Sequence, residues 1–543
     1  MPQHSRSAPR GRGVAIAAAV VALVVAAGAA VYLGLPSLRA LQERRVFPAA
    51  TAPATAGGPA PSVAPLVPAT QAPASFAGQR YAARLPAPSG DKPQSKVWRA
   101  DGAWWAVLVS AKKKVPTVHE LRDDHTWRDT GTVVDARADS TADVLFEKNA
   151  LYVVSRTLTG AITYARFRYT PAKRSYVRAD GFPATVATGG AESASLARDT
   201  TGTVWATYTQ GGRVWFARAG PEDDTAWSRA LLRVPDNTVG ADDVSAIVAF
   251  DGKVGIAWSD QGDWAFRFAV HVDGDAPGTW KVETPLSGEG MVDDHINLKA
   301  VAGDGRVFAA VKTSQDLVGA GDEAPGMYVL RRDPDGTWEK AVVGLVGDRL
   351  TRPQLLLDRE SSRVYLFEGA PTTGGTIYYK SSPFDGLKFA TGRGAPFIKA
   401  PAGAAINDVS TTKGSTTPAV GAVAIAVDTT GHRYFHGELP ITADDIQPPL
   451  AQTQITSSPT AEGAITTTWL PATDDRGVVA YDVYMNGVVV ETIDVTAQNE
   501  NTRQWSFTSP TLTPGTYQFA IEARDAAGNT APRRTAKQVV VVP

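Results

Sequence analysis

A repeat of about fifty residues constrains the fold of this chain more than any other feature of its sequence. Six aromatic residues, each preceded by a short turn, follow one another at spacings of 49 to 58 residues. They are Trp127, Tyr176, Trp227, Trp280, Trp338 and Phe389. Between them lie short stretches of alternating apolar and polar residues divided by Gly, Asp and Pro, as in "TVWATYTQGGRVWFARA". Such stretches predict pairs of antiparallel β-strands.

Four short strands per repeat, repeated many times, predict a mainly β chain folded as a β-propeller. Residues 79–447 hold about seven repeats, so we expect a seven-bladed propeller. The last repeat, 406–439, contains three recognisable strands, and "QRYAARL" at 79–85 supplies a spare one. Pairing these two segments would join the ends of the ring and remove its exposed sheet edges.

Two of the turns carry a short motif. The turn "DAPGTW" at 275–280 places Asp275, Thr279 and Trp280 at positions that resemble the Asp-box of sialidase-like propellers. The turn "DPDGTW" at 333–338 has the equivalent three residues, and both turns lack the serine of the motif. Asp-box turns are structural in that family, so the resemblance implies a fold and no catalytic role.

Residues 448–543 form a separate module. The stretches "AITTTWLPATDDRGVVAYDVYMNGVVVETI" and "TLTPGTYQFAIEARDAAGN" resemble a fibronectin type III domain, a β-sandwich. The resemblance implies that Trp469 and Tyr481 pack in the core. It also implies that the hydroxyl of Tyr517 binds nearby backbone. Bacterial modules of this family often accompany extracellular carbohydrate-active enzymes, which is an association rather than evidence of a site.

The N-terminal region predicts a membrane anchor. Residues 14–35 carry no charge and as a helix would span ~33 Å, about one hydrocarbon core. Three arginines in the basic tail of residues 1–13 favour a cytoplasmic N-terminus. Residues 36–78 are a Pro/Ala-rich linker that favours an extended spacer. We therefore expect a single-pass plasma-membrane protein with extracytoplasmic domains, or a secreted one if residues 14–35 are a cleaved signal.

Composition and motifs exclude several function classes. A formal net charge of −1 argues against a nucleic-acid partner, which would need a surplus of Lys and Arg. The absence of cysteine excludes disulfides and thiolate chemistry. No nucleotide-binding, zinc-protease or nucleophile-elbow motif occurs, so we expect no cofactor. His432 and His436 would lie ~13 Å apart on a strand, too far to share a metal, and no metal site is predicted.

Polar residues on the first strand of several repeats give the main functional hypothesis. In "MVDDHINLKAV" at 291–301, His295, Asn297 and Lys299 share one face of a strand that should line the central channel. First strands of other repeats and neighbouring strands would add Arg352, Lys413, Lys312 and Lys380. Arginine grips a carboxylate with two hydrogen bonds and lysine supplies a point charge. These six cationic and amide side chains would form a cationic mouth that binds an acidic glycan.

Other interpretations of the same residues stay open. The channel residues would be merely solvated, or paired with Asp242, Asp243 and Asp293. A polysaccharide-degrading enzyme, a glycosidase or lyase, would use His295, Tyr378 or Asp243 as catalytic groups, although no motif fixes them. A cell-envelope scaffold would bind proteins through other surfaces. Product release from acidic polysaccharides separates the enzyme from a glycan-binding protein.

Overall fold

The computed structural model of this chain is mainly β. It describes residues 73–81, 88–90, 92–235, 237–301, 303–390, 392–399, 401, 403–441, 449–474, 477–496, 499, 502–525 and 528–541. These residues form strands β1 to β38 and two short 3-10 turns, η1 (Pro171–Lys173) and η2 (Val346–Asp348). The prediction of a mainly β chain built from four-stranded sheets is confirmed.

Consecutive antiparallel sheets account for residues 97–398. The first contains β2 (Val97–Ala100), β3 (Ala103–Val109), β4 (Pro116–Leu121) and β5 (Trp127–Val133). The second contains β6 (Thr141–Glu147), β7 (Ala150–Arg156), β8 (Ile162–Thr170), β9 (Ser175–Arg178) and β10 (Ala184–Ala187). The third contains β11 (Ala194–Arg198), β12 (Val204–Gln210), β13 (Arg213–Ala219) and β14 (Ser228–Leu231).

Three further sheets repeat the same order of strands. The fourth contains β15 (Ser245–Phe250), β16 (Lys253–Asp260), β17 (Ala265–Val272) and β18 (Lys281–Ser287). The fifth contains β19 (Ile296–Ala300), β20 (Val307–Lys312), β21 (Pro325–Arg332) and β22 (Trp338–Leu345). The sixth contains β23 (Thr351–Asp358), β24 (Arg363–Ala370), β25 (Thr376–Pro383) and β26 (Ala395–Ile398).

The seventh sheet joins the two ends of this array. It has the order β1-β29-β28-β27, with β1 (Ala74–Arg80), β27 (Ile406–Ser410), β28 (Ala422–Asp428) and β29 (Arg433–Leu439). Strand β1 pairs with β29 in the register Phe76 to His436. The structure therefore has the predicted closure, but the closing strand is Ala74–Arg80 instead of 79–85, and residues 82–87 lie outside the described residues.

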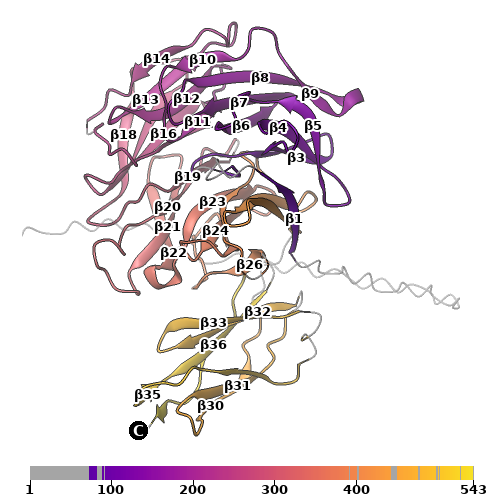
Figure 1. Ribbon diagram of the computed structural model, residues 1–543. Helices are drawn as coiled ribbons and strands as arrows, with labels where there is room; N and C mark the ends of the chain where they lie inside the picture. Colours follow the sequence, from indigo (N-terminus) through magenta and orange to yellow (C-terminus); the bar gives the residue numbers. More distant parts are fainter. Residues whose placement is uncertain are drawn as a thin grey trace, which may run out of the picture. The chain divides into compact units, whose positions relative to one another are not determined.

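The first strand of each sheet contacts the first strand of the next. Contacts run from β2 to β6, β11, β15, β19, β23 and β27 in turn, and β2 also contacts β28. A parallel bridge between Val97 and Thr412 links the first and last sheets. Figure 1 shows the sheets following one another around the upper part of the molecule. This circular order, with first strands innermost, is that of a β-propeller.

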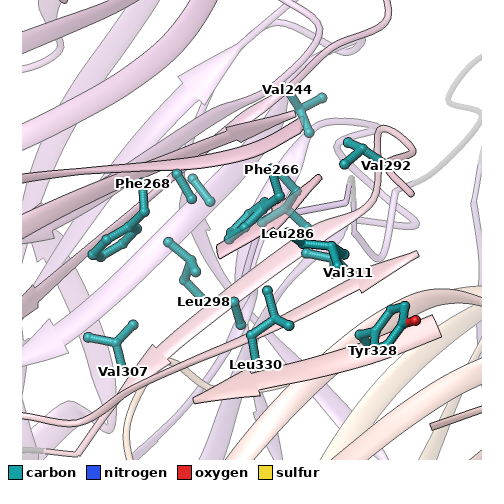
Figure 2. Close-up of a cluster of buried hydrophobic side chains, with 14 of the residues drawn as sticks. Val244, Phe266, Phe268, Leu286, Val292, Leu298, Val307, Val311, Tyr328 and Leu330 are labelled. Atoms are coloured by element: carbon teal, nitrogen blue, oxygen red, sulfur yellow. The ribbon is translucent and has the colours of Figure 1, made fainter. Parts of the chain in front are cut away.

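Apolar side chains fill the space between neighbouring sheets. Figure 2 shows the cluster between the fourth and fifth sheets, where Phe266 and Phe268 of β17 pack toward Leu298 of β19 and Leu330 of β21. Each of these side chains is buried. Because the alternation of each strand places apolar groups on both faces, each sheet is held on both sides by its neighbours. The inner strands are thereby fixed around one axis.

Loss of strand β1 is expected to destabilise the ring. A chain beginning at residue 81 lacks the partner of β29 and exposes an unpaired sheet edge, whereas a chain beginning at residue 73 keeps it. We expect the shorter chain to have a Tm lower by about 5 °C or more and to aggregate on heating. Thermal unfolding with light scattering measures both. Equal behaviour of the two chains would show that β1 does not close the ring.

The C-terminal module contains the remaining strands. One sheet contains β30 (Thr453–Pro459), β31 (Ile465–Leu470) and β34 (Trp505–Thr508). Another contains β33 (Val488–Asp494), β32 (Val478–Met485), β36 (Phe519–Asp525) and β37 (Arg534–Thr535). A third pairs β35 (Gly515–Tyr517) with β38 (Val539–Val541).

Aromatic residues of this module lie where the sequence places them. Trp469 and Tyr481 are buried with ring centroids 5.6 Å apart. The Tyr517 hydroxyl donates to the carbonyl of Thr513 at 2.9 Å, which is the predicted contact with nearby backbone. Two antiparallel sheets with an aromatic core between them form a sandwich.

The predicted membrane localisation is corrected. Residues 14–35, the predicted span, lie outside the described residues, as do residues 1–13 and most of the predicted linker 36–78. Among the residues that the structure describes, no helix has the length and apolar character needed to cross a bilayer. The prediction of a single-pass plasma-membrane protein is therefore withdrawn.

Candidate functional site

A segment of the chain's own backbone lies among the inner strands of the ring. Residues 88–90 and 92–96 connect β1 to β2 and are largely buried. Ser89 donates to the carbonyl of Asp408 on β27, and Gln354 of β23 donates to the carbonyl of Lys92 at 2.6 Å. Gln94 donates to the carbonyl of Ala194 on β11. The ring is therefore not an open channel at this level, because this segment contacts strands from several sheets.

An acidic layer surrounds Lys92 of this segment. The Lys92 ammonium lies 2.6 Å from Glu192 and 3.5 Å from Asp242, and it also contacts Asp294. The three carboxylates are close enough to one another to hold a metal ion. The ammonium lies among them instead. Burial lowers the pKa of Lys92, but Asp294 and Glu192 raise it more, so this lysine stays charged.

His295 belongs to the same acidic layer. Its Nδ1 lies 2.5 Å from Asp294 and also contacts Asp293, which binds Lys312 at 2.6 Å. Burial lowers the pKa of His295, but hydrogen bonds to the two carboxylates outweigh it and raise the pKa above its usual value. A histidine that holds its proton between two carboxylates is a poor general base. The geometry thus gives the predicted catalytic role no support.

A lysine layer lies farther along the inner strands. We define it as Lys96, Lys299, Lys413 and the carboxylate of Asp143. Lys299 donates to the Ser95 hydroxyl at 2.9 Å, and Lys96 donates to the carbonyl of Ala142 at 2.7 Å. Lys413 binds Asp143. Burial lowers the pKa of Lys96 and of Lys299 to about 7 each. The structure brings Lys299 and Lys413 together, as predicted, but it buries Lys299 in the interior and leaves Lys413 partly exposed.

Arg352 and Asn297 have partners on neighbouring strands. The Arg352 guanidinium lies 2.5 Å from Asp408, and both residues have left-handed backbone, with φ of +53° and +56°. Each lies at a register shift of its strand pair, and such bulges re-aim side chains. Asn297 donates to the Gln354 side chain at 3.0 Å and accepts from the Leu355 N–H. These groups hold strands β19, β23 and β27 together.

Three predicted site residues lie away from the axis or serve local structure. The Lys380 ammonium is buried against the carbonyls of Val343, Ala390 and Gly392. Tyr378 packs on the apolar cluster between the fifth and sixth sheets. Asp243 accepts hydrogen bonds from Gly240 N–H and from Gln261, so it fixes a loop. The predicted cationic mouth is not assembled, because its members pair with carboxylates or carbonyls, or are buried.

The sequence analysis missed Lys92, Lys96 and Asp143. Asp143 lies on β6, the first strand of its sheet, and the same rule that placed His295 at the axis applies to it. Lys96 directly precedes β2, another first strand. The turn-rich segment before β2 has no alternating pattern, so its course through the ring leaves no signal in the sequence.

Trp104 of β3, which is 7% exposed, borders several hollows on the surface. Three adjoining hollows share this tryptophan, and we call them together the Trp104 groove. The outer cleft has a volume of about 1010 Å³, the inner pocket about 280 Å³ and the side pocket about 380 Å³. Residues of the first and last sheets line all three. The groove therefore forms where the first and last sheets of the ring meet.

Charged and aromatic groups line this groove. In the outer cleft, Glu120 is held by Arg128 at 2.8 Å and by Arg174 at 2.5 Å. In the inner pocket, Arg99 and Lys413 are the charged lining residues, beside Trp98, Phe146 and several hydroxyls. The Arg99 guanidinium lies 5.6 Å from the Trp104 ring centroid and donates to the carbonyl of Gly102. Within the described part of the chain, no carboxylate pairs with Arg99.

Curated relatives match a short part of this chain. Chitinase Chi52 of Paenibacillus xylanexedens is 32% identical over 103 residues, which are 19% of this chain and 18% of that protein. Chitinase D of Niallia circulans is 36% identical over 86 residues, 16% of this chain and 15% of that protein. The chain thus spans less than a fifth of the length of these relatives. No known family model matches it.

Solved structures are similar at a low level. An Aleuria aurantia lectin mutant in complex with α-methyl-L-fucoside has a TM-score of 0.37 and 10% identity, covering 58% of this chain and 97% of that one. CoXyl43, a GH43 β-xylosidase/α-arabinofuranosidase from a compost microbial metagenome, has a TM-score of 0.28 and 9% identity, covering 49% of this chain and 98% of that one. Similarity at this level assigns neither a fold nor an activity, and the strand order above carries the description of the ring.

Proposed function

We propose that this protein binds a polysaccharide along the Trp104 groove. The observation that carries the proposal is the meeting of three hollows at one tryptophan. A chain of sugar rings needs an elongated surface that offers apolar ring faces together with convergent hydrogen-bonding groups. The relatives that match part of this chain are named as chitinases, which are proteins that act on a polysaccharide.

The inner pocket favours an acidic sugar within that polysaccharide. Its volume of about 280 Å³ is close to the lower size of small-ligand pockets, roughly 300 Å³. Its charged lining residues are both cations, and the Lys413 ammonium is already bound to Asp143. The guanidinium of Arg99 is planar, and its N–H groups can donate to both oxygens of a carboxylate. A uronate residue in this pocket would stack on the apolar wall and bind Arg99.

The proposed architecture is a seven-bladed propeller followed by a fibronectin type III domain. Seven sheets in circular order support the first part. The aromatic core and the Tyr517 contact with Thr513 support the second. We place the match to the chitinases on this C-terminal module, since the matched stretches have about its length. On this placement the match associates the chain with polysaccharides but does not locate the site, and the site in the ring is argued from the Trp104 groove alone. The module itself would be a spacer.

Replacing Arg99 with glutamine tests the site. We expect the unchanged protein to bind a polyuronate more tightly than a neutral glucan or chitin oligosaccharides. Arg99→Gln should weaken polyuronate binding about tenfold, because a charge-assisted pair is lost, and leave neutral binding unchanged. Calorimetric titration measures each affinity. The matched control is Arg229→Gln, which removes a guanidinium 4.2 Å from the Trp215 ring centroid on the third sheet.

Each possible outcome has a distinct meaning. No binding to any polysaccharide would contradict the proposed function. Equal loss of polyuronate binding in Arg99→Gln and Arg229→Gln would show that the polyuronate does not bind in the Trp104 groove. Release of shorter sugars from the bound polymer would show a polysaccharide-degrading enzyme, in which case the groove carboxylates Asp101, Glu120 and Glu438 are the residues to replace next.

A further inference from the structure

The lysine layer contains more positive charge than its described carboxylate can balance. Lys96, Lys299 and Lys413 are all within electrostatic range of Asp143 or of one another. Asp143 is fully buried, and its oxygens already accept from Ser95 N–H, Leu196 N–H and the Ser195 hydroxyl as well as from Lys413. Its hydrogen-bonding capacity is therefore used, and it cannot also bind the other two ammonium groups.

Several buried donors of this layer lack acceptors. A lysine ammonium has three N–H donors, yet Lys299 has one acceptor, the Ser95 hydroxyl, among the described residues. Lys96 has two, the carbonyl of Ala142 and the Gln94 side chain, and neither is charged. Unpaired buried donors cost free energy, so they indicate a missing acceptor.

We propose that the lysine layer binds a small inorganic anion, such as chloride, against the Lys299 ammonium. A small anion supplies both the missing negative charge and the missing acceptor. Lys299 and Lys96 are 3% and 1% exposed, so an anion bound here would be enclosed by the protein, which favours a small ion over a sugar acid. Lys413, a member of this layer, also lines the inner pocket. The site is separate from the proposed polysaccharide contact at Arg99.

The lowered pKa values of the two lysines agree with this site. Burial moves the pKa of Lys299 and Lys96 to about 7, so each is neutral in alkaline solution and charged in acid. Two charged groups also act on Lys299: Lys413 lowers its pKa further, and Asp143 raises it. Anion binding should accordingly be stronger at pH 6 than at pH 9, because it requires the charged lysines.

Thermal unfolding in matched salts tests the proposal. At pH 6 and constant ionic strength, we expect a Tm about 2–5 °C higher in sodium chloride or bromide than in sodium gluconate, whose anion is too large for the layer. The difference should vanish at pH 9 and in Lys299→Met. Lys340→Met, which removes an exposed lysine of β22, should keep the Tm difference between chloride and gluconate. An equal Tm in chloride and gluconate at pH 6 would overturn the proposal.

Crystallography with bromide gives a second test that needs no variant. Crystals of the unchanged protein grown at pH 6 and soaked in sodium bromide should show an anomalous peak in contact with the Lys299 Nζ. Peaks confined to surface lysines would contradict the site even if Lys299→Met failed to fold.

Discussion

Replacing Asp143 with alanine is expected to lower the free energy of unfolding of the ring by about 3–5 kcal/mol. The carboxylate is fully buried and accepts from the N–H groups of Ser95 and Leu196 at 2.8 Å each. It is also the ion-pair partner of Lys413. Alanine leaves two buried N–H groups without this acceptor, and it leaves the Lys413 ammonium without its carboxylate, with only the Leu196 carbonyl and the Ser195 hydroxyl as acceptors. Removing one partner of a buried pair costs more than the pair contributes.

Urea denaturation of the variant measures this loss. Asp335→Ala is the matched control, because Asp335 is exposed and caps its own turn through Thr337. Asp335→Ala should lower the free energy of unfolding by less than about 1 kcal/mol. The double variant Asp143→Ala, Lys413→Met should recover part of the loss, since it removes the orphaned charge. A loss below 1 kcal/mol for Asp143→Ala would contradict the central role of this carboxylate.

The second large effect is a pH dependence of stability caused by Lys299. Its pKa is 10.5 in the unfolded chain and about 7 when buried in the fold. As pH falls from 10.5 to 7, the unfolded chain gains a proton that the folded chain does not, so stability falls by up to ~1.4 kcal/mol per pH unit. Below pH 7 Lys299 is charged in both the folded and the unfolded chain, so its destabilising contribution no longer changes with pH. Lys299 thus destabilises the fold most at and below pH 7.

Lys299→Met should remove the destabilisation that the buried Lys299 ammonium causes. In gluconate buffer at pH 7 the variant should be more stable than the unchanged protein, on the order of 3 kcal/mol, and the difference should shrink toward pH 10. Lys96 titrates in the same range and remains in both proteins, so comparing the two isolates Lys299. Urea denaturation at each pH gives the values. A difference that does not change with pH would show that Lys299 titrates normally in the fold.

The sequence predicts the sheets well because their signal is local. Strand alternation and turn spacing act within fifty residues, and Trp280 and Trp338 each mark the start of the fourth strand of a sheet, β18 and β22. Period two also places His295 and Lys299 on the inward face of β19. The closing strand is shifted by about five residues, because the ladder with β29 depends on a partner more than 350 residues away.

The site is less predictable because its contacts join distant parts of the chain. Arg352 and Asp408 pair through two bulges whose left-handed residues carry no glycine signal. Lys380 shares a strand face with Tyr378 and Ser382, and no pattern shows that backbone carbonyls will surround its ammonium. The Trp104 groove joins β3 to the loop that follows β27, about three hundred residues later. Pairing across such separations is a property of the closed ring, and local propensity does not encode it.

The closure by β1 has a consequence for biosynthesis. Strand β1 is the first described strand to be synthesised, and β29 is the last strand of the ring. Because the two pair, β1 has no hydrogen-bonding partner until β29 has been synthesised. Residues 92–96, which contact inner strands of later repeats, wait in the same way. The ring therefore stays an open arc until β29 has left the ribosome, which happens while the C-terminal module is still being synthesised. During that interval a chaperone has two complementary strand edges to shield.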